Sequence, residues 1–224
     1  VPWSDFLLNP RRLRGSDFLM RWSQGVWSEH RIVEAIGGSG HFFALPYGPS
    51  STAPDNDVRA YELYFERLEK AGLGELKRPD LLVFRKTHEP VVRRIVKELG
   101  GQDELPFIEE QHMDELLQMA IVGIECENSL WRADKMPHFG SQLKPMKRLG
   151  WRPGLSKSAK LPTIIVKEED RKPLRAWQKS TGLPIHIWQV FYDRAYGISF
   201  SRIEELIREG LIEPKNQRYQ APGG

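Results

Sequence analysis

The sequence predicts an α/β domain, in which short buried strands alternate with amphipathic helices. Two short apolar segments, residues 78–84 and 122–128, have the length and composition of buried strands. Segments with apolar residues at helical spacing lie around and between them. Residues 163–192 read as strand, helix and strand, which predicts a parallel strand pair joined by a crossover helix. A chain of 224 residues without a repeat or a linker predicts a single domain over residues 1–224.

The N-terminal part, about residues 1–75, is expected to be mainly helical. Ser16 is predicted to cap one helix and Ser28 a second, which ends at two glycines. Residues 41–47 predict a strand, and Asp57 opens a helix with apolar residues at clean helical spacing. The later elements are expected as a helix over 91–99, a helix near 113–117, a strand at 163–166, a helix capped by Asp170 to about residue 181, a strand at 184–192, and a helix opened by a capping box of Ser201 and Glu204.

Acidic residues interrupt the two predicted buried strands at residues 78–84 and 122–128. Glu125 and Glu127 are two positions apart and therefore share one face of their strand, while Val122, Ile124 and Cys126 share the other. Burying these carboxylates beside a third, Asp80, is costly unless a positive charge lies among them. A hard divalent cation such as Mg²⁺ takes carboxylate oxygens as ligands. The sequence therefore predicts a metal site formed by Asp80, Glu125 and Glu127.

A basic segment, about residues 132–160, follows the second acidic strand, and we call it the basic arm. It contains eight basic residues and one acid, Asp134, although the net charge of the whole chain is only +3. Its glycines, prolines and serines predict a long loop, which suits a polyanion such as nucleic acid; a solvated surface loop is the alternative. Trp131 and Trp151 are expected to pack under the arm rather than to stack on a base. The residues expected to contact DNA are Arg132, Lys135, Lys144, Lys147, Arg148 and Arg152.

The pair Pro79-Asp80, followed on a later strand by Glu125-x-Glu127, resembles the PD-(D/E)xK nuclease superfamily, and type II restriction endonucleases in particular. The resemblance covers about residues 59–192. It implies a mixed central sheet flanked by helices, Mg²⁺ held by Asp80 and Glu125 at the scissile phosphate, and double-stranded DNA as substrate. The last motif position is usually lysine, so this chain has an ExE variant. Glu127 is then either a native base or metal ligand, or an engineered change that inactivates the enzyme.

Other residues are candidates to complete this site. Lys167 follows the predicted strand at 163–166 and can replace the missing lysine in space; a surface charge at a strand end is the alternative. Glu29 or Glu34 can add a helix carboxylate, as happens in some members of the superfamily. Their alternative role is that of solvated acids on a helix face.

The predicted function is that of a magnesium-dependent, sequence-specific endonuclease that cuts double-stranded DNA. Cutting a palindrome needs two active sites, so we expect a homodimer. A DNA-repair or junction nuclease of the same fold and a non-catalytic nucleic-acid-binding protein are the alternatives. We expect no membrane anchor and no secretion signal, because no segment has the required pattern. The lone Cys126 fits a reducing cytosol, and the resemblance implies a prokaryotic cytoplasm.

Overall fold

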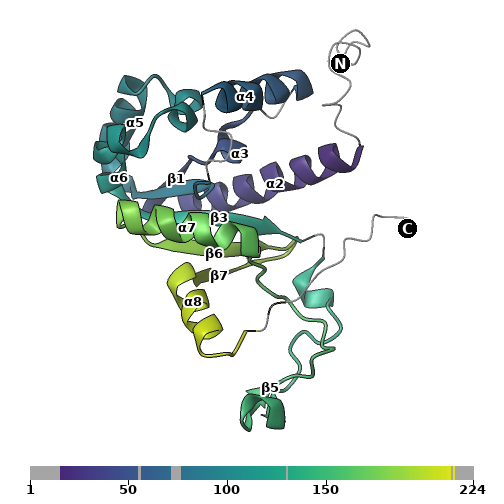
Figure 1. Cartoon of the computed structure of the whole chain (residues 1–224). Helices are drawn as coiled ribbons and strands as arrows, with labels where there is room; N and C mark the ends of the chain where they lie inside the picture. Colours follow the sequence, from purple (N-terminus) through teal and green to yellow (C-terminus); the bar gives the residue numbers. More distant parts are fainter. Residues whose placement is uncertain (1–15, 55–56, 72–76, 130, 213, 215–224) are drawn as a thin grey trace.

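The fold is a mixed five-stranded sheet with helices on both faces (Figure 1). The structure is a computed structural model that describes residues 16–54, 57–71, 77–129, 131–212 and 214. Strands β1 and β2, β2 and β3, and β6 and β7 pair antiparallel, whereas β3 and β6 pair parallel. This confirms the predicted α/β class with a mixed central sheet. In sheet order the strands are β1 (Phe42–Pro46), β2 (Leu81–Arg85), β3 (Ala120–Asn128), β6 (Ile185–Val190) and β7 (Ala195–Ser199).

The helices cover the sheet unequally. On one face α2 packs through Ile32 against apolar residues of the central strands. The opposite face carries the larger core, to which α5, α6, α7 and α8 all contribute buried side chains. The α-helices are α2 (Ser16–Gly38), α3 (Pro49–Thr52), α4 (Val58–Lys70), α5 (Glu89–Glu98), α6 (Asp114–Met119), α7 (Glu168–Thr181) and α8 (Phe200–Arg208). Short 3₁₀ helices are η2 (Lys86–His88), η3 (Gln102–Phe107), η4 (Glu110–His112), η5 (Ala133–Lys135) and η6 (Lys147–Leu149), and a separate hairpin joins β4 (Lys144–Met146) to β5 (Arg152–Gly154).

Strand β3 presents different residues to the two faces. Val122, Ile124 and Cys126 pack in the α2-side core. Gly123, on the other face, lies directly under Pro79 and the ring of Trp177 in α7. The alternation of a strand then places Glu125 and Glu127 together on the α7 face. The sequence predicted that they share a face but not which helix covers it.

The N-terminal helices differ from the prediction. Residues 16–38 form one helix, because Ser28 lies inside it and its Oγ donates a hydrogen bond to the Gly25 carbonyl oxygen at 2.7 Å rather than capping a new helix. Serine in a helix interior commonly bonds back to the preceding turn. In contrast, Asp57 caps α4 as expected, accepting hydrogen bonds from the backbone of Arg59 and Ala60.

The C-terminal elements also correct the prediction. Residues 163–166 form no strand, because both sides of β6 are occupied by β3 and β7. The segment packs Ile164 and Val166 against the larger core instead, and the Ile165 N–H donates to Gln189 Oε1 at 3.2 Å. The parallel pair joined through α7 is therefore β3 with β6. Asp170 lies inside the first turn of α7 rather than at its cap. Ser199, not Ser201, caps α8 by accepting from the Arg202 N–H.

Candidate active site

The segment that precedes β2 is fixed by a buried arginine. The side chain of Arg78 is fully buried, and it donates from Nε to Glu110 Oε1 at 2.6 Å and from Nη1 to the Leu105 carbonyl oxygen at 2.9 Å. One residue after Pro79, the carbonyl oxygen of Asp80 accepts a hydrogen bond from the Tyr47 N–H at 2.8 Å. These bonds hold the start of β2, and with it Asp80, against the rest of the sheet.

The structure brings Asp80 and Glu125 together. The last paired positions of β2 and β3 are Leu81 and Ile124, so the antiparallel register places Asp80 opposite Glu125. Side chains at such positions have Cβ atoms about 4.5–5.5 Å apart. Cys126 lies where β3 continues beyond the end of β2, and its N–H donates a hydrogen bond to Asp80 Oδ2 at 2.7 Å. Asp80 and Glu125 are both buried, with 5% exposure each, so two acids adjoin in the interior.

A lysine that the sequence analysis did not identify lies among these acids. Lys77 Nζ donates a hydrogen bond to Glu125 Oε1 and lies 3.9 Å from Asp170 Oδ1. Burial acts to lower the pKa of Lys77, but the charges of Glu125 and Asp80 and the hydrogen bond to Glu125 outweigh it and raise that pKa. Lys77 therefore carries the positive charge that the buried acids require.

Glu125 still has one unsatisfied oxygen. Its Oε2 atom is buried and finds no hydrogen-bond partner among the residues that the structure describes. Burial raises the pKa of the Glu125 carboxyl well above its usual range, the charge of Asp80 adds to this effect, and Lys77 opposes it. A buried carboxylate oxygen without a partner is costly unless a cation or water fills the position.

Glu127 and Lys167 also meet, at the end of β3. Lys167 Nζ lies 2.9 Å from Glu127 Oε1 and 4.0 Å from Asp170 Oδ2. The Lys167 side chain is 51% exposed, whereas that of Glu127 is only 18% exposed. Burial raises the pKa of Glu127, and Lys167 acts against that rise. Lys167 thus lies beside the acidic cluster, on a loop rather than at the end of a strand, and its role in place of the motif lysine stays a prediction.

Three carboxylates are close enough to bind one ion. Glu125, Glu127 and Asp170 each offer one oxygen, and these atoms all lie within 4.8 Å of one another. Oxygens that bind the same Mg²⁺ or Ca²⁺ at about 2.0–2.6 Å lie at most about 5 Å apart. With the open Glu125 Oε2 beside them, these residues fit a hard divalent cation. The sequence did not identify Asp170 as a metal ligand, because an acid in the first turn of a helix is also a normal helix-stabilising residue.

Residues 9–147, more than half of the chain, match the AccI restriction endonuclease family. The chain belongs to the AccI restriction endonuclease family. It is accordingly a sequence-specific type II restriction enzyme whose substrate is DNA. The matched residues include Lys77, Asp80, Glu125 and Glu127 but stop before α7. Comparisons with curated proteins and with solved structures gave no significant match.

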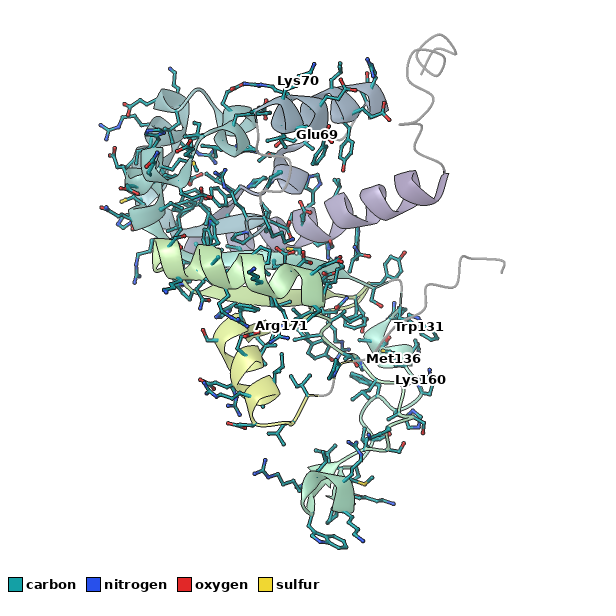
Figure 2. The ribbon with its side chains drawn as sticks, viewed as in Figure 1. Glu69, Lys70, Trp131, Met136, Lys160 and Arg171 are labelled. Atoms are coloured by element: carbon teal, nitrogen blue, oxygen red, sulfur yellow. The ribbon has the colours of Figure 1, made fainter. Side chains whose placement is uncertain are left out.

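In this AccI-family enzyme, the packing of α7 sets the position of Asp170. Leu174 and Trp177 anchor the helix in the core. Arg171, labelled in Figure 2, donates from Nε to Glu204 Oε1 on α8 at 2.8 Å. The first turn of α7, with Asp170, therefore stands at the carboxyl end of β3.

The two helix glutamates proposed from the sequence lie elsewhere. Glu34 is 67% exposed and pairs with Arg31 at 3.1 Å, so it is a solvated helix-face acid. Glu29 is close enough to Cys126 for its charge to contribute, after burial and Asp80, to raising the pKa of that thiol. Cys126 belongs to the α2-side core, which is the face opposite to Glu125.

The basic arm is exposed along most of its length. Figure 2 shows Trp131, Met136 and Lys160 along the segment that leaves the sheet. Trp131 and Trp151 are 58% and 69% exposed, so the expectation that both pack under the arm is wrong. Of the predicted DNA contacts, Arg132 forms an ion pair with Asp134 at 3.0 Å, and Arg148 Nη2 donates to the Leu155 carbonyl oxygen at 2.5 Å. Lys135, Lys144, Lys147 and Arg152 are exposed.

None of the helices in the part of the chain that the structure describes is long and apolar enough to cross a membrane.

Proposed function

We propose that this enzyme hydrolyses phosphodiester bonds of double-stranded DNA with Mg²⁺ held by Asp80, Glu125 and Glu127, and with Asp170 as a further ligand. The observation that carries the proposal is that Glu125, Glu127 and Asp170 each offer an oxygen within 4.8 Å of the others, beside a buried Glu125 oxygen that has no partner among the described residues. Asp80 is not in this set, and its proposed role rests on its place opposite Glu125 in the strand register. The set of three carboxylates occurs at the end of a central strand in a member of a restriction endonuclease family. The Asp80 and ExE pattern fits a PD-(D/E)xK-type site.

The bound cation would polarise the phosphate and lower the pKa of an attacking water. Glu127 is the candidate base for that water, because its carboxylate lies beside the proposed cation site, where a metal-bound water would stand. Lys167 is the candidate for the missing motif lysine. Its half-exposed ammonium group contacts Glu127 and is open to an incoming phosphate, whose developing negative charge it would stabilise.

Lys77 has a different proposed role. Its Nζ contacts Glu125 and approaches Asp170, the same oxygen-rich region that the cation would use. In the protein without metal, Lys77 would hold the carboxylates together and oppose the protonation of Glu125.

The test is cleavage of supercoiled plasmid DNA with Mg²⁺, followed by mapping of the ends. We expect discrete fragments whose ends share one sequence, and no cleavage in EDTA. Glu125→Gln should reduce cleavage by about 10²–10³-fold or more. Glu34→Gln, which alters an exposed acid paired only with Arg31 among the described ion pairs, is the matched control and should cut normally. Full activity of Glu125→Gln would place the active site elsewhere.

The end mapping also separates the alternative nuclease role. A DNA-repair or junction nuclease of the same fold would select DNA structure, so its ends would not share a sequence. The family match favours the restriction enzyme. It also decides against a protein that binds nucleic acid without catalysis, since the family is one of nucleases.

A further inference from the structure

The β4–β5 hairpin stands apart from the sheet and its helices (Figure 1). Its strands pair antiparallel, from Lys144 opposite Gly154 to Met146 opposite Arg152. The loop between the strands turns back when the Trp151 N–H donates to the Met146 carbonyl oxygen at 3.0 Å. The hairpin is therefore a small two-stranded ribbon with Trp151 at its tip.

Trp151 has an unusual backbone conformation. Its φ is 65°, and no other non-glycine residue in the described part of the chain has a positive φ. Bulky side chains rarely adopt this region, and such conformations concentrate at ligand-binding and catalytic sites. The neighbouring Gly150 adopts φ 61° without a comparable penalty. The chain thus places a large aromatic residue where glycine or asparagine is the usual choice.

The two apolar side chains of the loop have opposite environments. Leu149 folds back onto the hairpin, where its methyl group fills the space beside Gly154. Trp151 does not fold back, and its side chain remains 69% exposed. An exposed indole leaves more apolar area in contact with water than an isolated surface leucine does, so burial against a binding partner would stabilise it more.

Basic residues flank Trp151 in the sequence. Residues 144–157 contain five basic residues and no acid. Lys144, Lys147 and Arg152 are exposed, and no acidic side chain among the described residues forms an ion pair with any of them. Arg148 and Arg152 also line a hollow of about 850 Å³ between the hairpin and the end of α8. Unpaired cations around an aromatic residue complement a polyanion that also offers flat, stackable groups.

We propose that the β4–β5 hairpin enters a groove of the DNA duplex and that Trp151 stacks its indole ring on a base there. The inference rests on the proposed function only in taking double-stranded DNA as the substrate. The major groove of B-DNA admits a two-stranded β-ribbon. The lysines and arginines contact phosphates on either side, and the ring partly unstacks a base step. A second copy of the chain is the weaker candidate partner, because a two-fold contact through this hairpin would bring like charges together.

The experiment measures binding of linearised plasmid DNA in EDTA, so that no cleavage intervenes and no recognition sequence need be known. Two variants separate the ring from the backbone: Trp151→Asn suits the positive φ but removes the ring, whereas Trp151→Phe keeps an aromatic ring. Leu143→Asn is the matched control, because it removes another apolar side chain of the arm that is 56% exposed.

We expect Trp151→Asn to bind roughly 5- to 150-fold more weakly, the usual effect of losing one base stack, and Trp151→Phe to bind within about threefold of wild type. The dependence of log K on log salt should be unchanged in both, because the ring releases no counterions. Lys144→Ala with Lys147→Ala should lower that slope by about two units. Permanganate should oxidise unstacked thymines with wild type and not with Trp151→Asn.

Two results would overturn the inference. One is a Trp151→Asn variant that binds like wild type and like Leu143→Asn. The other is a change in the sedimenting mass of Trp151→Asn without DNA, which would assign the ring to a protein–protein contact. Failure of the proposed function is seen separately: wild type that binds through Trp151 but never cleaves with Mg²⁺ contradicts the nuclease chemistry alone.

Discussion

At the scale of single residues, the ion pair between Lys77 and Glu125 predicts a measurable contribution to stability. Lys77 contacts a glutamate that is almost fully buried, and about a quarter of its own side chain, 24%, reaches solvent. Removing one partner of a buried ion pair leaves the other uncompensated and costs about 3–5 kcal/mol. Because Lys77 is partly solvated, we expect Lys77→Met to lower the free energy of unfolding by about 1–3 kcal/mol in EDTA.

The same pair provides the control. Adding Glu125→Gln to Lys77→Met removes the orphaned charge, so the double variant should regain much of the lost stability. Urea denaturation of the four proteins in a double-mutant cycle measures the coupling. Strictly additive effects would show that Lys77 and Glu125 do not stabilise one another.

Glu127 determines whether the ExE motif is functional as it stands. If it is the native base or ligand, Glu127→Ala should abolish cleavage while leaving DNA binding largely intact. Glu127→Lys should also fail, because Lys167 already lies 2.9 Å from Glu127 Oε1 and a second ammonium group would repel it. Single-turnover cleavage across a Mg²⁺ titration measures all three versions. Faster cleavage by Glu127→Lys would instead identify Glu127 as an inactivating change.

The raised pKa values of Glu125 and Glu127 predict a pH dependence. Burial raises both pKa values in the folded state, so this state holds protons that the unfolded chain releases near pH 4.5. The stability from these protonated acids is present below pH 4.5 and is lost as pH rises through the folded pKa values. A divalent cation binds carboxylates in their ionised form, so Mg²⁺ at the proposed site should raise the melting temperature more as pH increases. Melting curves with and without Mg²⁺ test this. An equal Mg²⁺ effect in Glu125→Gln would contradict it.

At the scale of elements, the site depends on how closely the start of β2 crosses β3. A Cβ atom added to Gly123 would lie 2.7 Å from Pro79 Cγ and 3.4 Å from the ring of Trp177. We expect Gly123→Ala to displace Pro79, and Asp80 with it, at a cost of about 1–3 kcal/mol for overpacking. Cleavage should fall more than stability alone explains. Gly25→Ala in α2, where the added atom meets nothing within 4 Å, should be neutral or slightly stabilising by thermal melting. Equal behaviour of both variants would contradict the close crossing.

These elements also show which features of the fold and the site could be predicted from the sequence. The shared face of Glu125 and Glu127 was predictable, because a strand alternates with a period of two whatever surrounds it. The contributions of Lys77 and Asp170 were not, since both come from segments next to an element and depend on its tertiary position. The strand proposed at residues 163–166 has the right composition, but β3 and β7 occupy both sides of β6. The local sequence pattern could not show which segments would pair with the two sides of β6.

At the scale of the whole molecule, the mixed topology of the sheet brings the residues of the candidate site together. The amino end of β2, the carboxyl end of β3 and the first turn of α7 meet because β2 runs antiparallel and β6 parallel to β3. The sequence predicted the class of fold but not β7, whose short segment Ala195–Ser199 lies mostly half-buried at the sheet edge. The exposed basic hairpin lies outside this arrangement (Figure 1), so binding and chemistry should be separable by mutation.

We propose, finally, that the enzyme acts as a homodimer. The chain contributes one such carboxylate cluster within the described residues, and both strands of a palindrome are cut together only if two clusters are related by a two-fold axis. Sedimentation should therefore give twice the chain mass of 25.9 kDa. Co-expression of wild type and Glu125→Gln with different affinity tags should yield a doubly tagged heterodimer. With one active site, it should convert supercoiled plasmid to nicked circles, whereas wild type produces linear DNA. Linear DNA produced by the heterodimer at the wild-type rate would mean that each chain cuts both strands by itself.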